Sequence, residues 1–385
     1  MTIILAILVA LSPFAIDTFL VAMPDMAEFF GVEINIIQLT ITMYFLGFAI
    51  GNFLGGPLTD AFGRKTIALI GIAIYGLSAF LITISTKIEY VLALRILQAF
   101  GGGFATVTAN VIVRDRYEGR QVARIITVMS MIMMLAPLFA PLIGTVILHR
   151  FAWKGIFVFL YLFAILIFTL LLVMIPESRP KELITRHITG QQLLSKYKVF
   201  FSDPLSVTLM FSISFAMAGL YVFLSTSSFI FLKYFGIESA QFPIVFGSII
   251  SLNILMSLLN TLLLKRFSPR QMLQVGLLIQ LTAGLGLAVQ SLTGWASLYS
   301  IIINLMLFMG SLGLIFGNGS ATILNINPKV SGSANATLGI TRFVISFFIG
   351  SIISIFQSKT LVPIMVAMLC CSLISNLLYF TIRKK

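Results

Sequence analysis

The chain has 385 residues, of which 59% are apolar and 10% are charged, and its formal net charge is +13. A soluble domain carries about 25% charged residues, so this composition excludes a water-soluble globule and indicates a surface that faces lipid. The positive charge requires no nucleic-acid partner, because lysine and arginine gather in alternate loops between apolar segments.

Apolar segments recur along the whole chain, each close to the roughly 20 residues that a helix needs to cross the bilayer core. Their apolar runs are continuous, whereas the strands of a membrane β-barrel alternate apolar and polar residues. We therefore predict an all-α integral membrane protein with twelve transmembrane helices. In chain order they are expected at residues 3–24, 35–59, 66–85, 90–113, 122–148, 153–175, 204–232, 241–264, 271–292, 296–322, 332–356 and 360–381.

The loops between these segments differ in positive charge. If both termini are cytoplasmic, 18 of the 25 lysine and arginine residues fall on the inner side and 5 on the outer side. The other two, Arg95 and Arg342, fall inside predicted helices. Short cytoplasmic loops are enriched in lysine and arginine, so the distribution predicts that the N and C termini lie in the cytoplasm.

The longest and most polar connection runs from Pro176 to Asp203 and divides the predicted helices into two sets of six. We expect an N-terminal six-helix bundle at residues 1–176, a cytoplasmic linker at 177–203 and a C-terminal six-helix bundle at 204–385. Two such halves around a site near the bilayer midplane are a common layout of secondary transporters.

Asp17 is the one acidic residue, among twelve, that sits well inside a predicted helix. A carboxylate there is costly unless it is paired, protonated or hydrated. At 1.5 Å per residue, Asp17 is expected roughly 10 Å below the outer end of its helix and Arg95 roughly 8 Å deep. A direct or water-bridged pair can form if these helices are neighbours, which would suit a proton carrier. The alternatives are a permanently paired Asp17 and a scaffold Arg95 that binds backbone carbonyls.

Arg342 is expected near the midplane, about 15 Å into the eleventh predicted helix. No acidic residue follows Glu238 in the chain. The guanidinium therefore has to face water, a cavity or a polar neighbour such as Asn318 or Asn335. Two interpretations stay open, a cation that awaits an anionic substrate group and a structural residue satisfied by carbonyls.

Other polar or aromatic side chains inside the predicted helices are candidates to line a substrate cavity together with Arg342. They are Tyr44, Gln98, Asn110, Tyr221, Ser225, Asn318 and Asn335. An enzyme is not expected, because the sequence has no HExxH motif and no paired carboxylates inside a predicted helix. His149 and His187 fall in loops, and no metal site is predicted.

Several segments match motifs of one transporter family. Residues 56–65, GPLTDAFGRK, match the signature GxLxDxxGRK of the major facilitator superfamily between its helices 2 and 3. Residues 95–98, RILQ, resemble the helix 4 motif RxxQG, and residues 136–144 resemble the helix 5 antiporter motif, with Pro137, Pro141 and Gly144 in place. Within that superfamily, residues 17–24, Arg114-Asp115 and residues 223–229 resemble segments of the Bcr/CflA subfamily of drug:proton antiporters.

The resemblance implies a proton-binding role for Asp17 and a part in proton coupling for Arg95. It implies a cytoplasmic gate built from Gly56, Asp60, Gly63, Arg64, Lys65, Arg114 and Asp115, in which Asp60 and its basic neighbours latch the outward-facing state. The implied function is export of drugs or other small molecules across the bacterial inner membrane. Alternating access would be driven by the proton gradient, with no cofactor and with a monomer as the functional form.

The substrate stays open at this point. The subfamily more often has glutamine where this chain has Arg342, which favours a second possibility, an exporter of an endogenous anionic metabolite or siderophore. A proton symporter that imports such a compound is a third.

Overall fold

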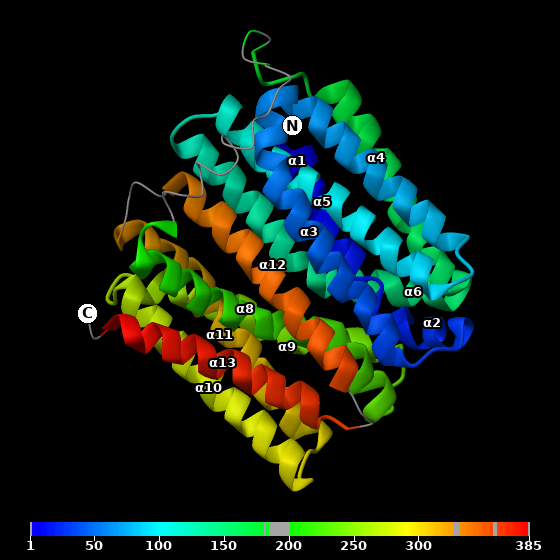
Figure 1. Cartoon of the computed structure of the whole chain (residues 1–385), viewed down its shortest axis with the longest axis vertical. Coiled ribbons are helices and arrows are strands. Elements are labelled where there is room, and N and C mark those ends of the chain that lie inside the picture. The colour runs from blue at the N-terminus through cyan, green and yellow to red at the C-terminus, as the bar shows by residue number, and fades with distance from the viewer. Residues whose placement is uncertain are drawn as a thin grey trace. The chain divides into compact units, whose positions relative to one another are not determined.

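The computed structural model describes residues 2–180, 182, 184, 201–326, 331–356 and 360–383, although the side chains of residues 120, 123, 324–326, 331–336, 382 and 383 are not described. All regular structure in these ranges is helical (Figure 1). The helices are α1 (Thr2–Asp17), α2 (Met23–Phe30), α3 (Ile34–Phe62), α4 (Arg64–Thr83), α5 (Ile88–Arg116), α6 (Arg120–Met174), α8 (Pro204–Ser228), α9 (Phe242–Leu263), α10 (Pro269–Thr293), α11 (Leu298–Ile326), α12 (Ser331–Phe356) and α13 (Val362–Arg383).

Eleven helical segments in the described part of the chain are long and apolar enough to cross a membrane. Every predicted helix overlaps one of them, because a run of about 20 apolar residues satisfies its backbone in lipid only as a helix. The first segment runs from Thr2 to Phe30 rather than ending near residue 24. Pro24 lies at the start of α2, a position that tolerates proline because its N–H would lack a helical partner anyway.

The predicted helices at 122–148 and 153–175 are joined in α6, which has 55 residues. A straight helix of that length would measure roughly 80 Å, more than twice the bilayer core. The helical pattern is interrupted at Ala152, whose φ of 55° and ψ of −174° lie outside the helical region. The turn between the two predicted helices is therefore a sharp kink at Ala152, which separates α6 into two helical parts, 120–151 and 153–174.

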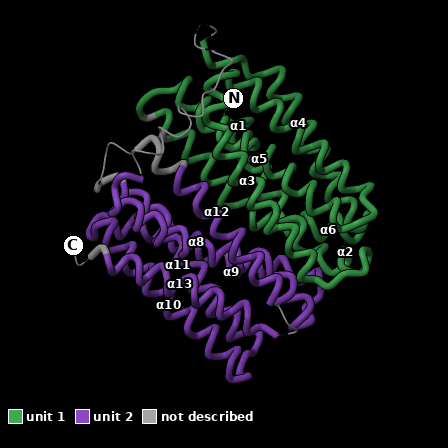
Figure 2. Tube along the Cα trace, viewed as in Figure 1, with its two compact units in different colours: residues 1–193 green, residues 194–385 purple. Residues whose placement is uncertain are grey.

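The chain divides into two compact units, unit 1 at Met1–Leu193 and unit 2 at Leu194–Lys385 (Figure 2). In unit 1, α5 packs against α1, α3 and α4, and α6 packs against α1 and α4. In unit 2, α8 packs against α11, α12 and α13, and α11 also packs against α9 and α10. The predicted linker at 177–203 lies mostly outside the described residues.

Close contact between α3 and α5 depends on small side chains in unit 1. A Cβ atom added to Gly47 of α3 would lie 2.1 Å from the carbonyl oxygen of Ile96. Glycine therefore lets the two backbones touch, as is common where membrane helices pack. Ile96 follows Arg95, so this contact fixes the height and rotation of the segment that carries the buried arginine.

Candidate functional site

Asp17 is the last residue of α1, at a break in the first membrane segment. The chain continues through η1, a 3₁₀ turn at Leu20–Ala22, into α2. Proline removes a backbone N–H, and its ring clashes with the carbonyl four residues earlier. Pro24 thus prevents an α-helix from running unbroken through Leu20, which explains why α1 and α2 are separate helices.

The carboxyl group of Asp17 is buried and has no polar partner among the described residues. The residue is 3% exposed, and its Oδ1 atom makes no hydrogen bond. Asp17 lies nearly midway between Thr2 and Phe30, roughly 20 Å from either end by the helical rise.

Arg95 of α5 is fully buried, at 0% exposure. Its Nη1 atom donates to the carbonyl oxygen of Ala15 at 3.1 Å and to Oε1 of Gln98 at 2.9 Å. Ala15 lies in the last turn of α1, where carbonyls lack partners within the helix. The broken end of α1 therefore supplies one acceptor for this cation.

Three aromatic rings surround the guanidinium of Arg95. Its Cζ atom lies 4.7 Å from the ring centroid of Tyr44, 4.9 Å from that of Phe19 and 5.9 Å from that of Phe157. Cation–π contacts of this kind are worth about 2 kcal/mol or more when they are desolvated. They offset part of the cost of a charge that pairs with no carboxylate in the described ranges.

Of the two pairings that the sequence left possible for Asp17 and Arg95, the direct ion pair is absent from the described residues, although α1 and α5 are neighbours. Arg95 instead contacts Ala15 and Phe19, which flank Asp17 by two positions on either side. The cation is therefore held by the segment that carries Asp17, through one backbone carbonyl and one aromatic ring.

Hydroxyl groups connect the same part of α1 to two further helices. Tyr44 of α3 donates to Oγ of Ser12 at 3.1 Å, and Tyr75 of α4 donates to the carbonyl oxygen of Leu11 at 3.0 Å. Both tyrosines are completely buried. Tyr44 therefore contacts Arg95 with its ring and α1 with its hydroxyl group, a role that its position in the sequence does not reveal.

Residues 136–144, which resemble the helix 5 antiporter motif, lie in α6 of this structure. Gly144 of this motif lies against Thr18, the residue after Asp17. A Cβ atom on Gly144 would lie 2.2 Å from the carbonyl oxygen of Thr18, so only glycine permits this approach. Pro137 and Pro141 lie within α6, where each removes an N–H from the helical ladder. The motif thus places a weakened stretch of helix beside the break in the first segment.

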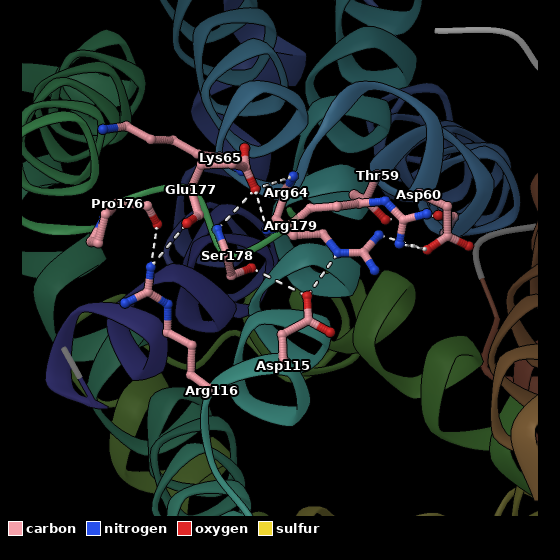
Figure 3. Close-up of polar contacts among 11 residues, drawn as sticks. Thr59, Asp60, Arg64, Lys65, Asp115, Arg116, Pro176, Glu177, Ser178 and Arg179 are labelled. Carbon is pink, nitrogen blue, oxygen red and sulfur yellow. Dashed lines mark hydrogen bonds and ion pairs between the residues drawn. The ribbon is translucent and has the colours of Figure 1, made fainter. Parts of the chain in front are cut away.

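A second group of charged residues joins the end of α3 to α4, α5 and the residues after α6 (Figure 3). We name it the junction cluster and define it as Asp60, Arg64, Lys65, Asp115, Arg116, Glu177, Ser178 and Arg179. Arg64 is buried, with Nη1 2.6 Å from Oδ1 of Asp60 and Nε 2.9 Å from Oδ2 of Asp115. Arg179 lies 3.7 Å from the same oxygen of Asp60.

Glu177 was not among the expected gate residues, yet it makes four of the contacts in the junction cluster. Its carboxylate accepts hydrogen bonds from the backbone N–H groups of Arg64 at 2.9 Å and Lys65 at 3.0 Å, and from those of Ser178 and Arg179. The first two belong to the first turn of α4, where free N–H groups and the helix dipole favour an anion. Only its place directly after Pro176 hints at this role in the sequence.

Gly63 is the residue between α3 and α4, and it serves the junction cluster in two ways. Its φ of 94° and ψ of 150° suit glycine alone among common residues. A Cβ atom there would also lie 2.7 Å from Oε2 of Glu177. The signature glycine thus allows the turn and leaves room for the carboxylate that caps α4.

Other contacts tie the end of α6 to the same cluster. Lys65 donates through Nζ to the carbonyl oxygen of Leu172 at 2.6 Å, and Arg116 donates to that of Pro176 at 2.7 Å. Arg114, by contrast, is exposed, and no hydrogen bond of its side chain is found in the described part. Arg64 and Arg179, rather than Arg114, are therefore the cations that pair with Asp60 in the described part of the chain.

The remaining predicted cavity residues do not form one group. Asn110 donates to the carbonyl oxygen of Thr106, and Ser225 to that of Val222, each within its own helix. Asn318 donates to Oδ1 of Asn260 at 2.8 Å and so joins α11 to α9 instead of contacting Arg342. The side chain of Asn335 lies outside the described part of the structure.

Arg342 of α12 contacts aromatic rings. Its Cζ atom lies 5.1 Å from the ring centroid of Phe316 and 4.8 Å from that of Phe343. The ring of Tyr221 in turn lies 5.0 Å from that of Phe343. Two of the predicted cavity residues, Tyr221 and Arg342, are thus joined through a phenylalanine that the sequence analysis did not select.

Comparison with known proteins gives one consistent result. The sequence model of the Major Facilitator Superfamily matches residues 5–355. A bicyclomycin resistance protein homolog of Haemophilus influenzae is 30% identical over 382 residues, which cover 99% of this chain and 95% of the relative. The multidrug resistance protein MdtL of Salmonella paratyphi A is 25% identical, with coverage of 97% and 93%.

Solved structures support the same fold. A crystal structure of a D-xylose–proton symporter superposes with a TM-score of 0.76 at 15% identity and covers 100% of this chain and 97% of that one. A bacterial homolog of the human lysosomal transporter Spinster, in an inward-facing and occupied conformation, gives 0.75 at 16% identity, with coverage of 100% and 96%. At such low identity these two structures bear on the fold alone.

Proposed function

The chain belongs to the major facilitator superfamily, and we propose that it is a proton-coupled antiporter that exports drugs or other small molecules by alternating access. The superfamily consists of multi-pass membrane transporters rather than enzymes. The observation that carries the proposal is Asp17, a buried carboxyl group that has no polar partner among the described residues and lies in the middle of a membrane segment.

The substrate class rests on the relatives. The names of two of them record resistance to bicyclomycin and to multiple drugs, and both align with nearly all of this chain. The helix 5 motif in α6 and its contact with Thr18 support an antiporter over a symporter, because the resemblance links that motif to antiport. Small apolar or amphipathic compounds are the expected cargo.

The topology that we propose has twelve spans, with both termini in the cytoplasm of a bacterial cell and the protein in its inner membrane. Ala152 divides α6 into parts that are each long enough for one span. Counted this way, each unit has six spans. The excess of lysine and arginine in alternate loops supports the orientation, and the named relatives are bacterial.

In the proposed cycle, a proton from the outer side binds the carboxyl group of Asp17 and allows return to the inward-facing state. Substrate then binds from the cytoplasm, the proton leaves to the inner side, and the substrate is released outside. Arg95 favours proton release when the conformational change brings its charge toward Asp17, since a nearby cation stabilises a carboxylate. Such a movement requires exchange of the bonds that now hold Arg95 to Ala15 and Gln98.

The junction cluster is proposed to hold one end state of the cycle. Arg64 bridges Asp60 and Asp115, and Glu177 caps the helix that carries Arg64. Charge-assisted hydrogen bonds of this kind are stronger than neutral ones, so breaking several at once creates a barrier between states. The proton gradient is the proposed energy source, with no cofactor, and the monomer is the proposed functional form.

Purified protein in proteoliposomes tests this function. Bicyclomycin flux is measured beside the internal pH, reported by trapped pyranine, under an imposed pH gradient. Antiport predicts that substrate movement in one direction moves protons in the other. Proton and substrate movement in the same direction would indicate symport, and bicyclomycin flux that is indifferent to the gradient would contradict proton coupling.

A further inference from the structure

A group of aromatic residues in unit 2 surrounds a cation that the proposed proton cycle does not use. We call it the Arg342 clamp and define it as Tyr221 of α8, Phe316 of α11, and Arg342 and Phe343 of α12. The two phenylalanine ring centroids lie 5.1 and 4.8 Å from Cζ of Arg342. Tyr221 packs behind Phe343, so three helices contribute to the clamp.

Arg342 has no acidic partner in the described part of the chain. Asp203 and Glu238 are the only acidic residues within unit 2, and neither forms an ion pair with Arg342. Asp203 instead accepts a hydrogen bond from Ser206. An uncompensated charge within a membrane span is costly, and cation–π contacts alone offset it only in part.

The hydrogen-bonding edge of Arg342 is also unused. No hydrogen bond from its side chain to a described residue is found, and its Nε atom is buried without a partner. Arg95 differs in this respect, because its Nη1 atom has two acceptors, a backbone carbonyl and Gln98. The aromatic contacts and an unpartnered Nε atom are common to both arginines, whereas Arg342 makes no side-chain hydrogen bond to any described residue.

There is open space beside the clamp on α12. A Cβ atom added to Gly339, one helical turn before Arg342, would meet no described atom within 4 Å outside its own stretch of helix. Residues three apart on a helix share a face, so Gly339 and Arg342 face the same way. Phe316 is itself 38% exposed. A small molecule can therefore approach the guanidinium from this side.

We propose that the Arg342 clamp is a binding subsite for the carboxylate of an anionic substrate with an aromatic or apolar body. This proposal rests on the proposed function as a small-molecule transporter and names the class of one of its substrates. Aromatic rings over the guanidinium leave its in-plane N–H groups available, and these match the two oxygens of a carboxylate. A cationic compound would meet like-charge repulsion, which a low-dielectric site strengthens.

Equilibrium binding to the purified full chain in lipid nanodiscs tests the subsite without any gradient. Three probes share one ring system and differ in charge: 1-naphthoate, 1-naphthamide and 1-naphthylmethylammonium. Binding is measured by titration calorimetry, with empty nanodiscs subtracted. Four variants are compared with the native chain: Arg342→Gln, Arg342→Lys, Gly339→Leu, and Arg270→Gln as a control for removal of an exposed arginine in the same unit.

The native chain should bind 1-naphthoate more tightly than the other two probes. Arg342→Gln should weaken naphthoate binding about ten- to hundredfold, the range expected for loss of a charge-assisted hydrogen bond, and leave the naphthamide Kd within about twofold. Arg342→Lys should lose part of the naphthoate affinity because lysine lacks the planar fork. Gly339→Leu, which meets no atom at its Cβ, should weaken naphthoate binding by filling the approach. Arg270→Gln should change nothing.

Equal loss for all three probes in Arg342→Gln would make Arg342 a scaffold residue and overturn the subsite. A native chain without preference for naphthoate, or an unaffected naphthoate Kd in Arg342→Gln, would overturn it as well. These outcomes are independent of the proton-coupling test, because binding at equilibrium requires neither Asp17 nor a pH gradient. Failure of the antiport assay with intact naphthoate selectivity would contradict the transport mechanism and leave the subsite in place.

Discussion

Arg95 donates a hydrogen bond to the carbonyl oxygen of Ala15 at 3.1 Å, two residues before the buried carboxyl group of Asp17. The cation is thus anchored to the end of α1. Because the acceptor is a backbone carbonyl exposed by the end of a helix, any movement at the break in the first segment changes the environment of both charged residues. This link is the basis of the proposed coupling between the proton and the conformational change.

Arg95→Lys should impair coupling although the positive charge remains. Lysine has no planar group to pack against Tyr44 and Phe157 while its nitrogen donates to Ala15 and Gln98. We expect the free energy of unfolding to fall by about 1–3 kcal/mol, the usual contribution of hydrogen bonds to a buried charge. We also expect fewer protons to be moved per substrate molecule. The exposed Arg150→Lys serves as control. Unchanged stability and coupling in Arg95→Lys would show that the geometry of the guanidinium is unimportant.

Gly63→Ala and Gly56→Ala provide a matched pair within one motif. Alanine at residue 63 must adopt a φ of 94° and would place its Cβ 2.7 Å from Oε2 of Glu177, at a cost of about 1–3 kcal/mol for the backbone alone. At residue 56 a Cβ atom meets nothing within 4 Å apart from its chain neighbours, and its φ is not positive, so the remaining cost is the clash of the added Cβ with the ring of Pro57. Thermal unfolding in detergent should therefore show a larger loss of stability for Gly63→Ala than for Gly56→Ala. The reverse order would refute the geometry of the turn.

Glu177→Gln should weaken the junction cluster. The variant keeps the shape of the side chain but removes its negative charge. That charge lies at the first turn of α4, where the carboxylate accepts hydrogen bonds from the backbone N–H groups of Arg64 and Lys65. A loss of about 0.5–2 kcal/mol in stability is expected from capping and helix-dipole effects. Turnover at saturating substrate should also change. Glu182→Gln, a nearby exposed acid, is the control, and equal effects of the two substitutions would mean that Glu177 has no special role.

Asp60→Ala should slow turnover more than it weakens substrate binding. The substitution removes the 2.6 Å contact with Arg64 but leaves Arg64 bonded to Asp115. The end state held by the cluster is thereby destabilised without any change to the residues around Asp17. Transport rates at saturation and equilibrium binding are measured on the same preparation. Weaker binding with a normal rate at saturation would argue against a latch.

The sequence was sufficient to predict where helices lie and which charged residues fall inside them. Runs of about 20 apolar residues have only one structural solution in lipid, so each predicted helix overlaps an observed one. Asp17, Arg95 and Arg342 stand out because charges inside such runs are rare. The ends of the helices were harder to predict. In α6 a single residue, Ala152, has non-helical φ and ψ angles, and Pro24 lies in the first turn of α2, where the end of a helix was expected.

The partners of the charged residues could not be predicted, because they depend on how helices pack. Glu177 contacts Arg64 across 113 positions in the chain, and no local pattern encodes such a distance. Arg95 binds a carbonyl that is free only because α1 ends nearby. The rings around Arg342 come from α11 and α12, and any of the 35 phenylalanines could have been selected from the sequence alone.

The most direct test of the account is substrate efflux by Asp17→Asn in proteoliposomes with an imposed pH gradient. Asparagine keeps the shape of the buried side chain but cannot bind or release a proton, so gradient-driven transport should be abolished while equilibrium binding of substrate and the folded state persist. Asp25→Asn, at an exposed acid in α2, should transport normally. Full proton-driven efflux by Asp17→Asn would contradict the assignment of Asp17 as the proton carrier.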